Sequence, residues 1–219
     1  MYDVMKITDF DFVVWDFNGT LLDDVAIGVE SVNTLLRRRG LPPIPSHERY
    51  REIFGFPVED YYRRAGFDLD NEPYDAVAHE WLAEYRFREK QAPLRRGAAE
   101  LIGFFDERHI PQAVLSATES RMLEEQLRDL GIAERFAEIC GNDNIYAVSK
   151  TETAVRWANM RNRGRILMIG DTPHDAETAR AAGFVPALVM GGHSTESKLK
   201  ATNEAVFTSF EELKETLLQ

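Results

Sequence analysis

The chain has 219 residues, with 26 Lys and Arg, 37 Asp and Glu and 44% hydrophobic residues, which is typical of one large globular domain or one domain with a smaller insertion. The formal net charge of −11 opposes binding to a phosphate backbone and excludes nucleic acid as a partner. The single cysteine, Cys140, cannot form an internal disulfide, so we expect a reducing compartment, the cytoplasm.

Neither secretion nor membrane spanning is expected. Residues 1–11 carry three acidic residues where a signal peptide would be apolar. Nowhere does the sequence contain 18 consecutive apolar residues.

The first predicted element is a buried strand over residues 12–16, an apolar run rich in β-branched and aromatic residues. It ends at Asp16, just before the turn signal Asn18-Gly19. From Asp24 to Gly40 the apolar residues recur at helical spacing, which predicts an amphipathic helix. Residues 46–92 keep helical periods and show no convincing strand, so we expect a helical block after the first strand.

After Pro93 strands and helices alternate. The predicted strands are 110–116, 137–141, 165–170 and 185–190, and the predicted helices are 98–108, 119–130, 151–162, 175–182 and 209–217. Such alternation indicates an α/β fold with a doubly wound parallel sheet and helices on both faces. The helical block is then an insertion, residues 22–92, in a core made of residues 1–21 and 93–219.

In such sheets the ligand lies beyond the carboxyl ends of the strands. Polar residues stand there in four groups: Asp16 with Asn18 and Thr20; Ser116; Lys150; and Gly170-Asp171 running into Asp175. A hydroxyl, an ammonium group and several carboxylates at one rim suit a phosphate held together with a divalent cation. Mg²⁺ is the expected cation, because it takes oxygen ligands and would remove the repulsion between the carboxylates and the phosphate.

These groups resemble, in order, the four motifs of the haloacid dehalogenase (HAD) superfamily, and the resemblance covers essentially the whole chain. The motifs are Asp16-Phe-Asn-Gly-Thr-Leu21, Ser116, Lys150 and Gly170-Asp-Thr-Pro-His-Asp175. The resemblance implies a Rossmann-like core. Residues 22–92 resemble the type 1 helical cap of members similar to phosphoglycolate phosphatase.

The resemblance also implies a role for each matched residue. Asp16 would be the nucleophile that forms an aspartyl-phosphate, and Lys150 would pair with it and with the phosphate. The implied substrate-binding residues are Thr20, Ser116, Ala117 and Lys150. The implied Mg²⁺ ligands are Asp16, Asn18 through its backbone carbonyl, Asp171 and Asp175. A carboxylate nucleophile beside a metal and a lysine needs no base for its first step.

Asn18 departs from the family, whose phosphatases usually have at this position a second aspartate that acts as general acid and base. An amide cannot transfer that proton, and general acid–base catalysis contributes roughly 10²–10⁴-fold. We therefore expect slow hydrolysis of alkyl esters and a smaller loss on good leaving groups. A substitute proton shuttle at His174 or His47, or deamidation at Asn18-Gly19, would restore the rate.

The expected function is Mg²⁺-dependent hydrolysis of a small phosphorylated metabolite by a monomer or homodimer. The alternative is a catalytically attenuated HAD protein that binds a phosphorylated ligand. Phosphonate hydrolysis is disfavoured because the cap contains no lysine between Lys6 and Lys90. Dehalogenation would not need the Gly170-Asp171 motif, and a phosphomutase would need the missing aspartate. The substrate is left open.

Overall fold

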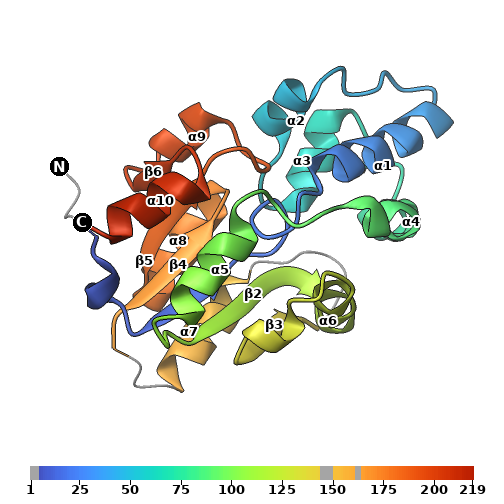
Figure 1. Cartoon of the computed structure of the whole chain (residues 1–219). Helices are drawn as coiled ribbons and strands as arrows, with labels where there is room; N and C mark the ends of the chain where they lie inside the picture. Colours follow the sequence, from blue (N-terminus) through green and yellow to red (C-terminus); the bar gives the residue numbers. More distant parts are fainter. Residues whose placement is uncertain (1–4, 144–149, 161–163) are drawn as a thin grey trace.

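A computed structural model describes residues 5–143, 150–160 and 164–219, and its central feature is a six-stranded parallel sheet (Figure 1). The strand order is β3-β2-β1-β4-β5-β6. The strands are β1 Phe12–Trp15, β2 Gln112–Glu119, β3 Glu138–Asn142, β4 Ile166–Gly170, β5 Val185–Val189 and β6 Ala205–Phe207. From β1 the chain adds strands β2 and β3 on one side, and from β4 it adds β5 and β6 on the other, so the topological switch point lies between β1 and β4.

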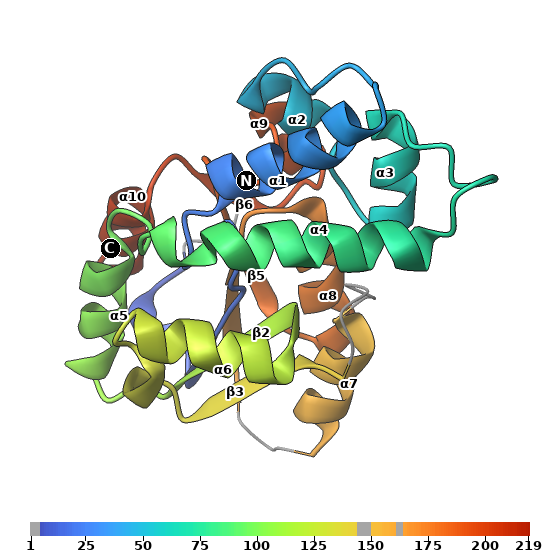
Figure 2. The same cartoon turned by 90° about the vertical axis from the view of Figure 1, so that its right-hand side faces the viewer.

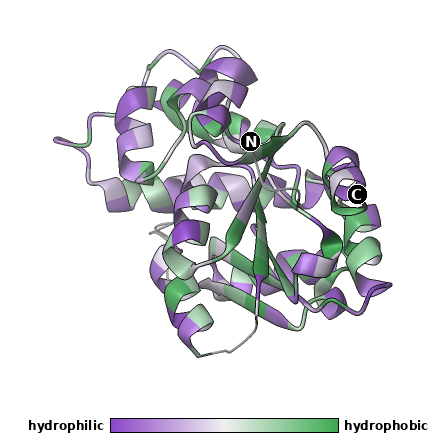
Figure 3. Ribbon diagram, turned by 90° about the vertical axis from the view of Figure 1, so that its left-hand side faces the viewer, coloured by the Kyte–Doolittle hydropathy of each residue, from purple (hydrophilic) through white to green (hydrophobic). Residues whose placement is uncertain are grey.

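Helices cover both faces of this sheet. They are α5 Ala98–Asp106, α6 Ser120–Asp129, α7 Thr151–Asn159, α8 Pro173–Ala182, α9 Glu196–Lys200 and α10 Phe210–Leu217. Along β1, Val13 and Trp15 pack into one hydrophobic cluster with α5 and α10, while Phe12 and Val14 pack into another with α7 and α8. Figure 2 shows α5 and α10 on one side of the sheet and α7 and α8 on the other. The central strands β1 and β4 are buried along their whole length, as expected of parallel strands covered on both faces. In Figure 3 the middle of the sheet is largely green, the colour of hydrophobic residues.

Between β1 and α5 the chain forms four helices that gather apart from the helices covering the sheet (Figures 1 and 2). They are α1 Val25–Arg38, α2 His47–Ile53, α3 Val58–Ala65 and α4 Tyr74–Arg88, and we call them the helical group. The helical group has a hydrophobic cluster of its own, which includes Val32, Leu35, Tyr62 and Val77. The boundaries 22–92 for a separate cap stay a prediction.

The α/β fold with a doubly wound parallel sheet is confirmed, while several boundaries differ from expectation. Strand β2 runs to Glu119, beyond the predicted end at residue 116. Helix α8 begins at Pro173, two residues before the predicted start, because Thr172 is its N-cap. Strand β6 and helix α9 were not predicted. No helix among the described residues is long and apolar enough to cross a membrane.

Candidate active site

The predicted site residues lie at the carboxyl edge of the sheet, around the end of β1. Asp16 follows β1, Asp171 follows β4, Ser116 lies in the second half of β2, and Lys150 directly precedes α7. Asp175 lies in the first turn of α8. These five side chains are all buried. Segments more than 130 residues apart in sequence therefore meet at one point, as the predicted sheet requires.

Lys150 is the centre of the charge arrangement. Its Nζ atom donates to Asp16 Oδ1 and lies 2.5 Å from Asp175 Oδ1. Burial alone would lower the pKa of Lys150, but the two carboxylates outweigh burial and raise the pKa above its ordinary value. The lysine is therefore a fixed positive charge between two acidic side chains.

Three carboxylates share this small space. Asp16, Asp171 and Asp175 each present an oxygen that lies within 4.8 Å of the other two. Burial raises the pKa of Asp16 to about 8 against the attraction of Lys150, and the charges of Asp175 and Asp171 add to the rise. Burial likewise raises the pKa of Asp171, with a further contribution from Asp175. One lysine cannot neutralise three buried carboxylates, and hard oxygen donors in excess negative charge suit Mg²⁺.

Asp171 is held by close backbone contacts and by two hydrogen bonds. A Cβ atom at Gly19 or Gly192 would collide with its carboxylate, so both positions require glycine. Thr20 Oγ1 donates to Asp171 Oδ1 at 2.8 Å, and the backbone N–H of His193 donates to Oδ2 at 2.5 Å. Thr20 is completely buried. Its observed contact positions Asp171, and its predicted contact with substrate stays a prediction.

Asp175 is oriented by the start of α8. Thr172 is the N-cap, and its N–H and Oγ1 groups donate to Asp175 Oδ2 at 2.8 and 2.7 Å. The backbone N–H of Asp175 returns a bond to Thr172 Oγ1, which completes a capping box. With Oδ2 engaged in the cap, Oδ1 is the oxygen that faces Lys150.

Asn18 is fixed by its side chain. Its Nδ2 group donates to Asp24 Oδ2 at 2.8 Å and to the Tyr85 hydroxyl at 3.1 Å, and its Oδ1 accepts from Thr118 Oγ1 at 2.6 Å. Tyr85 in turn donates to Asp24 Oδ2 at 2.7 Å. The amide is thus satisfied at both ends, and the predicted use of its backbone carbonyl as a metal ligand stays a prediction.

A buried pair of Asp24 and His193 lies beside the predicted motifs and was missed by the sequence analysis. His193 Nε2 is 3.1 Å from Asp24 Oδ1, and its Nδ1 is 2.8 Å from the Tyr50 hydroxyl. Burial opposes both charges, but the pair lowers the pKa of Asp24 and raises the pKa of His193 to about 9. The signal for His193 was its position after β5, at the same edge of the sheet.

The two histidines suggested as proton shuttles lie elsewhere. His174 stacks on Phe56 with ring centroids 4.5 Å apart and borders a second hollow. His47 is exposed at the start of α2. Neither is among the described residues that line the cavity beside Asp16, whereas His193 is.

That cavity has a volume of about 150 Å³. Residues at the carboxyl edge of the sheet border it on one side, among them the predicted substrate-binding residues Ser116, Ala117 and Lys150. Helical-group residues such as Tyr50 and Trp81 border it on the other side. A small molecule bound there would contact both the sheet edge and the helical group.

Comparisons with known proteins agree with this geometry. Residues 13–189 match the family model of haloacid dehalogenase-like hydrolases. The chain is 26% identical to the phosphoglycolate phosphatase of Photobacterium profundum, with 92% of this chain and 93% of that protein covered. It is also 26% identical to the N-acetylmuramic acid 6-phosphate phosphatase of Pseudomonas aeruginosa, with 86% and 85% covered.

A solved haloacid dehalogenase-like hydrolase from Streptococcus pneumoniae has the same fold, with a TM-score of 0.78 and 18% identity. The superposition covers 95% of this chain and 98% of that one. The family match spans strands β1 to β5, the helical group and the carboxylate cluster together. The chain therefore belongs to the haloacid dehalogenase-like hydrolases, as its four motifs predicted.

Proposed function

We propose that the protein is a Mg²⁺-dependent phosphatase that hydrolyses a small phosphorylated metabolite through an aspartyl-phosphate on Asp16. The observation that carries the proposal is the buried cluster of Asp16, Lys150, Asp171 and Asp175 at the switch point of the sheet. Mg²⁺ bound by Asp16, Asp171, Asp175 and the Asn18 carbonyl would offset the repulsion between the carboxylates and the phosphate. The phosphatase names of the similar proteins support the same chemistry.

Each residue of this cluster has a separate role in the proposed reaction. An Asp16 carboxylate oxygen attacks phosphorus, while Lys150 and the Ser116 hydroxyl hold phosphate oxygens. The bond from phosphorus to the ester oxygen breaks, and that oxygen leaves with its electron pair. Asn18 cannot protonate it, because its amide is neutral and its two polar atoms are already hydrogen-bonded. Water then cleaves the aspartyl-phosphate and regenerates Asp16.

We propose further that the helical group is a cap, since it borders the cavity opposite Asp16. The attenuated, ligand-binding alternative rests on Asn18 alone and predicts binding without turnover. The cytoplasmic location and the choice between monomer and homodimer stay predictions.

The test is phosphate release from phenyl phosphate with Mg²⁺. Asp16→Asn should lower the rate by roughly 10³-fold or more, because the nucleophile is lost. Asp23→Asn, an exposed neighbour in sequence, is the matched control and should keep the wild-type rate. Wild-type turnover by Asp16→Asn would contradict the proposal.

Metal binding is tested separately, without turnover. At a hundredfold excess of Mg²⁺ over its dissociation constant, the melting temperature should rise by roughly 5–10 °C. Asp171→Asn should abolish most of this rise. An equal rise in both proteins would show that Mg²⁺ binds elsewhere.

A further inference from the structure

The cavity beside Asp16 is mainly aromatic. Its walls in the helical group include Phe54, Phe56, Tyr61, Tyr62, Tyr74 and Trp81. These side chains come from α3, α4 and the segment between α2 and α3. Aromatic walls favour an aromatic guest, because rings pack edge-to-face or offset against one another.

The cavity is small. Its volume of about 150 Å³, close to that of an apolar protein cavity that accepts benzene, includes the end beside Asp16 and Lys150 where the phosphate would lie. One compact group beyond the phosphate fits this volume better than a nucleotide does.

The charges on the walls disfavour an acidic leaving group. Among the described lining residues the positive groups are Lys150 and His193. Lys150 already contacts Asp16 and Asp175, and His193 is paired with Asp24. A carboxylate on the leaving group would enter this cavity with no free cation among the described walls, which is costly for a buried charge.

From these observations, and resting on the proposed function, we propose that the substrate is a phosphate monoester of a phenol. Its single uncharged ring would occupy the aromatic part of the cavity. The bond between Asp16 and phosphorus forms as the bond from phosphorus to the aryl oxygen breaks. The phenolate leaves with the electron pair and takes its proton from solvent.

A phenol as leaving group also accounts for the amide at position 18. A phenol has a pKa near 10, close to that of tyrosine, so a phenolate departs without an acid far more readily than an alkoxide does. An enzyme that acts on aryl esters therefore tolerates an amide where an acid is otherwise needed.

The first test compares kcat/KM for three esters: phenyl phosphate, benzyl phosphate with its alkyl leaving group, and the acidic 2-phosphoglycolate. Phenyl phosphate should exceed 2-phosphoglycolate by roughly 100-fold, because the carboxylate would be buried unpaired. Asp16-dependent release that favours 2-phosphoglycolate or benzyl phosphate would overturn this inference and leave the proposed function standing. Absence of Asp16-dependent release from all three would overturn both.

The second test addresses the cavity walls. Trp81→Leu should lower kcat/KM for phenyl phosphate by roughly tenfold, because the ring loses an aromatic neighbour. Phe87→Leu is the matched control, since Phe87 lies on the same helix and is 80% exposed. Equal values for the two variants would overturn the placement of the ring.

Discussion

At the scale of single residues, Asn18 is matched to its neighbours. Asp24 accepts hydrogen bonds from Asn18, from Tyr85 and from the backbone N–H of Gly19. Asp24 Oδ2 now accepts a hydrogen bond from Asn18 Nδ2 at 2.8 Å. With aspartate at position 18, a second carboxylate would face this oxygen instead of a donor. The amide therefore stabilises a network that an acid would disturb, and the loss of a catalytic acid accompanies a gain in hydrogen bonding.

Asn18→Asp is expected to trade stability for catalysis. The free energy of unfolding should fall by about 1–3 kcal/mol, because a donor is replaced by a like charge. Hydrolysis of benzyl phosphate should rise relative to phenyl phosphate, because a protonated aspartate can serve the poorer leaving group. Urea unfolding and the ratio of the two rates provide the measurement. An unchanged ratio would show that position 18 does not exchange a proton with the leaving group.

A site residue could be predicted where the sequence around it shows a recognisable pattern. Asp16 and Asp171 were recognisable because each ends an apolar run and belongs to an ordered motif. Asp24 was taken for the start of a helix, and its partner His193 lies 169 residues away. Pairings between distant loops depend on tertiary packing, which periodicity does not report.

At the scale of elements, the Asp24–His193 pair ties the start of α1 to the loop after β5. Both side chains are buried, and the hydroxyl of Tyr50 from α2 contacts the other ring nitrogen of His193, Nδ1. The pKa of His193 is raised to about 9 by Asp24, so the folded state holds its proton more tightly than the unfolded state. The pair is thus a pH-dependent link between the helical group and the sheet.

Stability without added metal should therefore fall on the alkaline side. The stabilisation by protonated His193 is fully present below pH 6.5 and is lost as the pH rises through about 9. The loss is roughly 3 kcal/mol at most. Asp16, whose pKa is raised to about 8, adds a loss of its own over the same interval. Urea unfolding in a chelator at pH 6 and pH 9.5 measures the sum, and His193→Gln should reduce the difference by the contribution of His193. A difference as large in His193→Gln as in the wild type would assign the decline to other groups.

The elements themselves were predicted unevenly, for physical reasons. Strands β1 and β4 were clear because they are buried on both faces and read as continuous apolar runs. Strand β6 has only three residues and shows no period. The spacing of Val77, Trp81 and Tyr85 correctly predicted α4. It did not show that Val77 packs in the cluster of the helical group while Tyr85 packs in that of the sheet.

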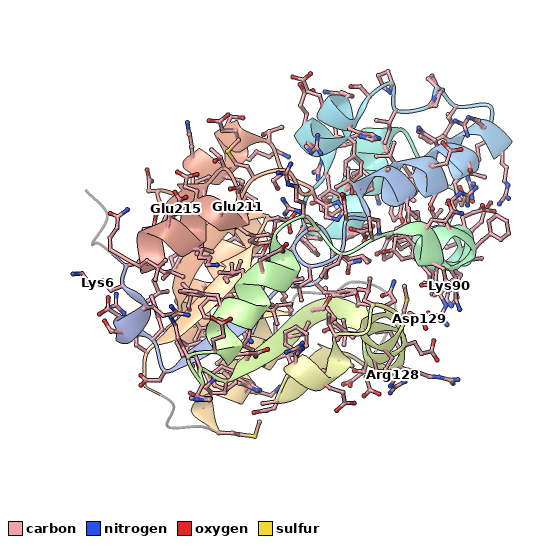
Figure 4. The ribbon with its side chains drawn as sticks, in the orientation of Figure 1. Lys6, Lys90, Arg128, Asp129, Glu211 and Glu215 are labelled. Atoms are coloured by element: carbon pink, nitrogen blue, oxygen red, sulfur yellow. The ribbon has the colours of Figure 1, made fainter. Side chains whose placement is uncertain are left out.

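At the scale of the whole molecule, separate hydrophobic clusters meet through polar contacts. Arg51 Nε donates to the Gly192 carbonyl at 2.7 Å, and Lys198 Nζ donates to the Arg51 and Phe54 carbonyls at 3.0 and 2.7 Å. On another side, Lys90 lies 3.5 Å from Asp129, and both are exposed (Figure 4). Such an exposed pair contributes little, so the Lys198 contacts are the stronger link.

Lys198 therefore holds the end of α2 next to α9 and with it the Phe54 wall of the cavity. Lys198→Met keeps the apolar stem but removes both hydrogen bonds, each worth about 0.5–1.5 kcal/mol. If the helical group closes over bound ester, KM for phenyl phosphate should rise roughly threefold to tenfold while kcat is not lowered, because closure is disfavoured and the Asp16 chemistry is untouched. Lys200→Met, on the same helix but exposed, is the control and should leave KM unchanged. A lower kcat at unchanged KM would instead mean that Lys198 supports the chemical step and does not hold the helical group closed.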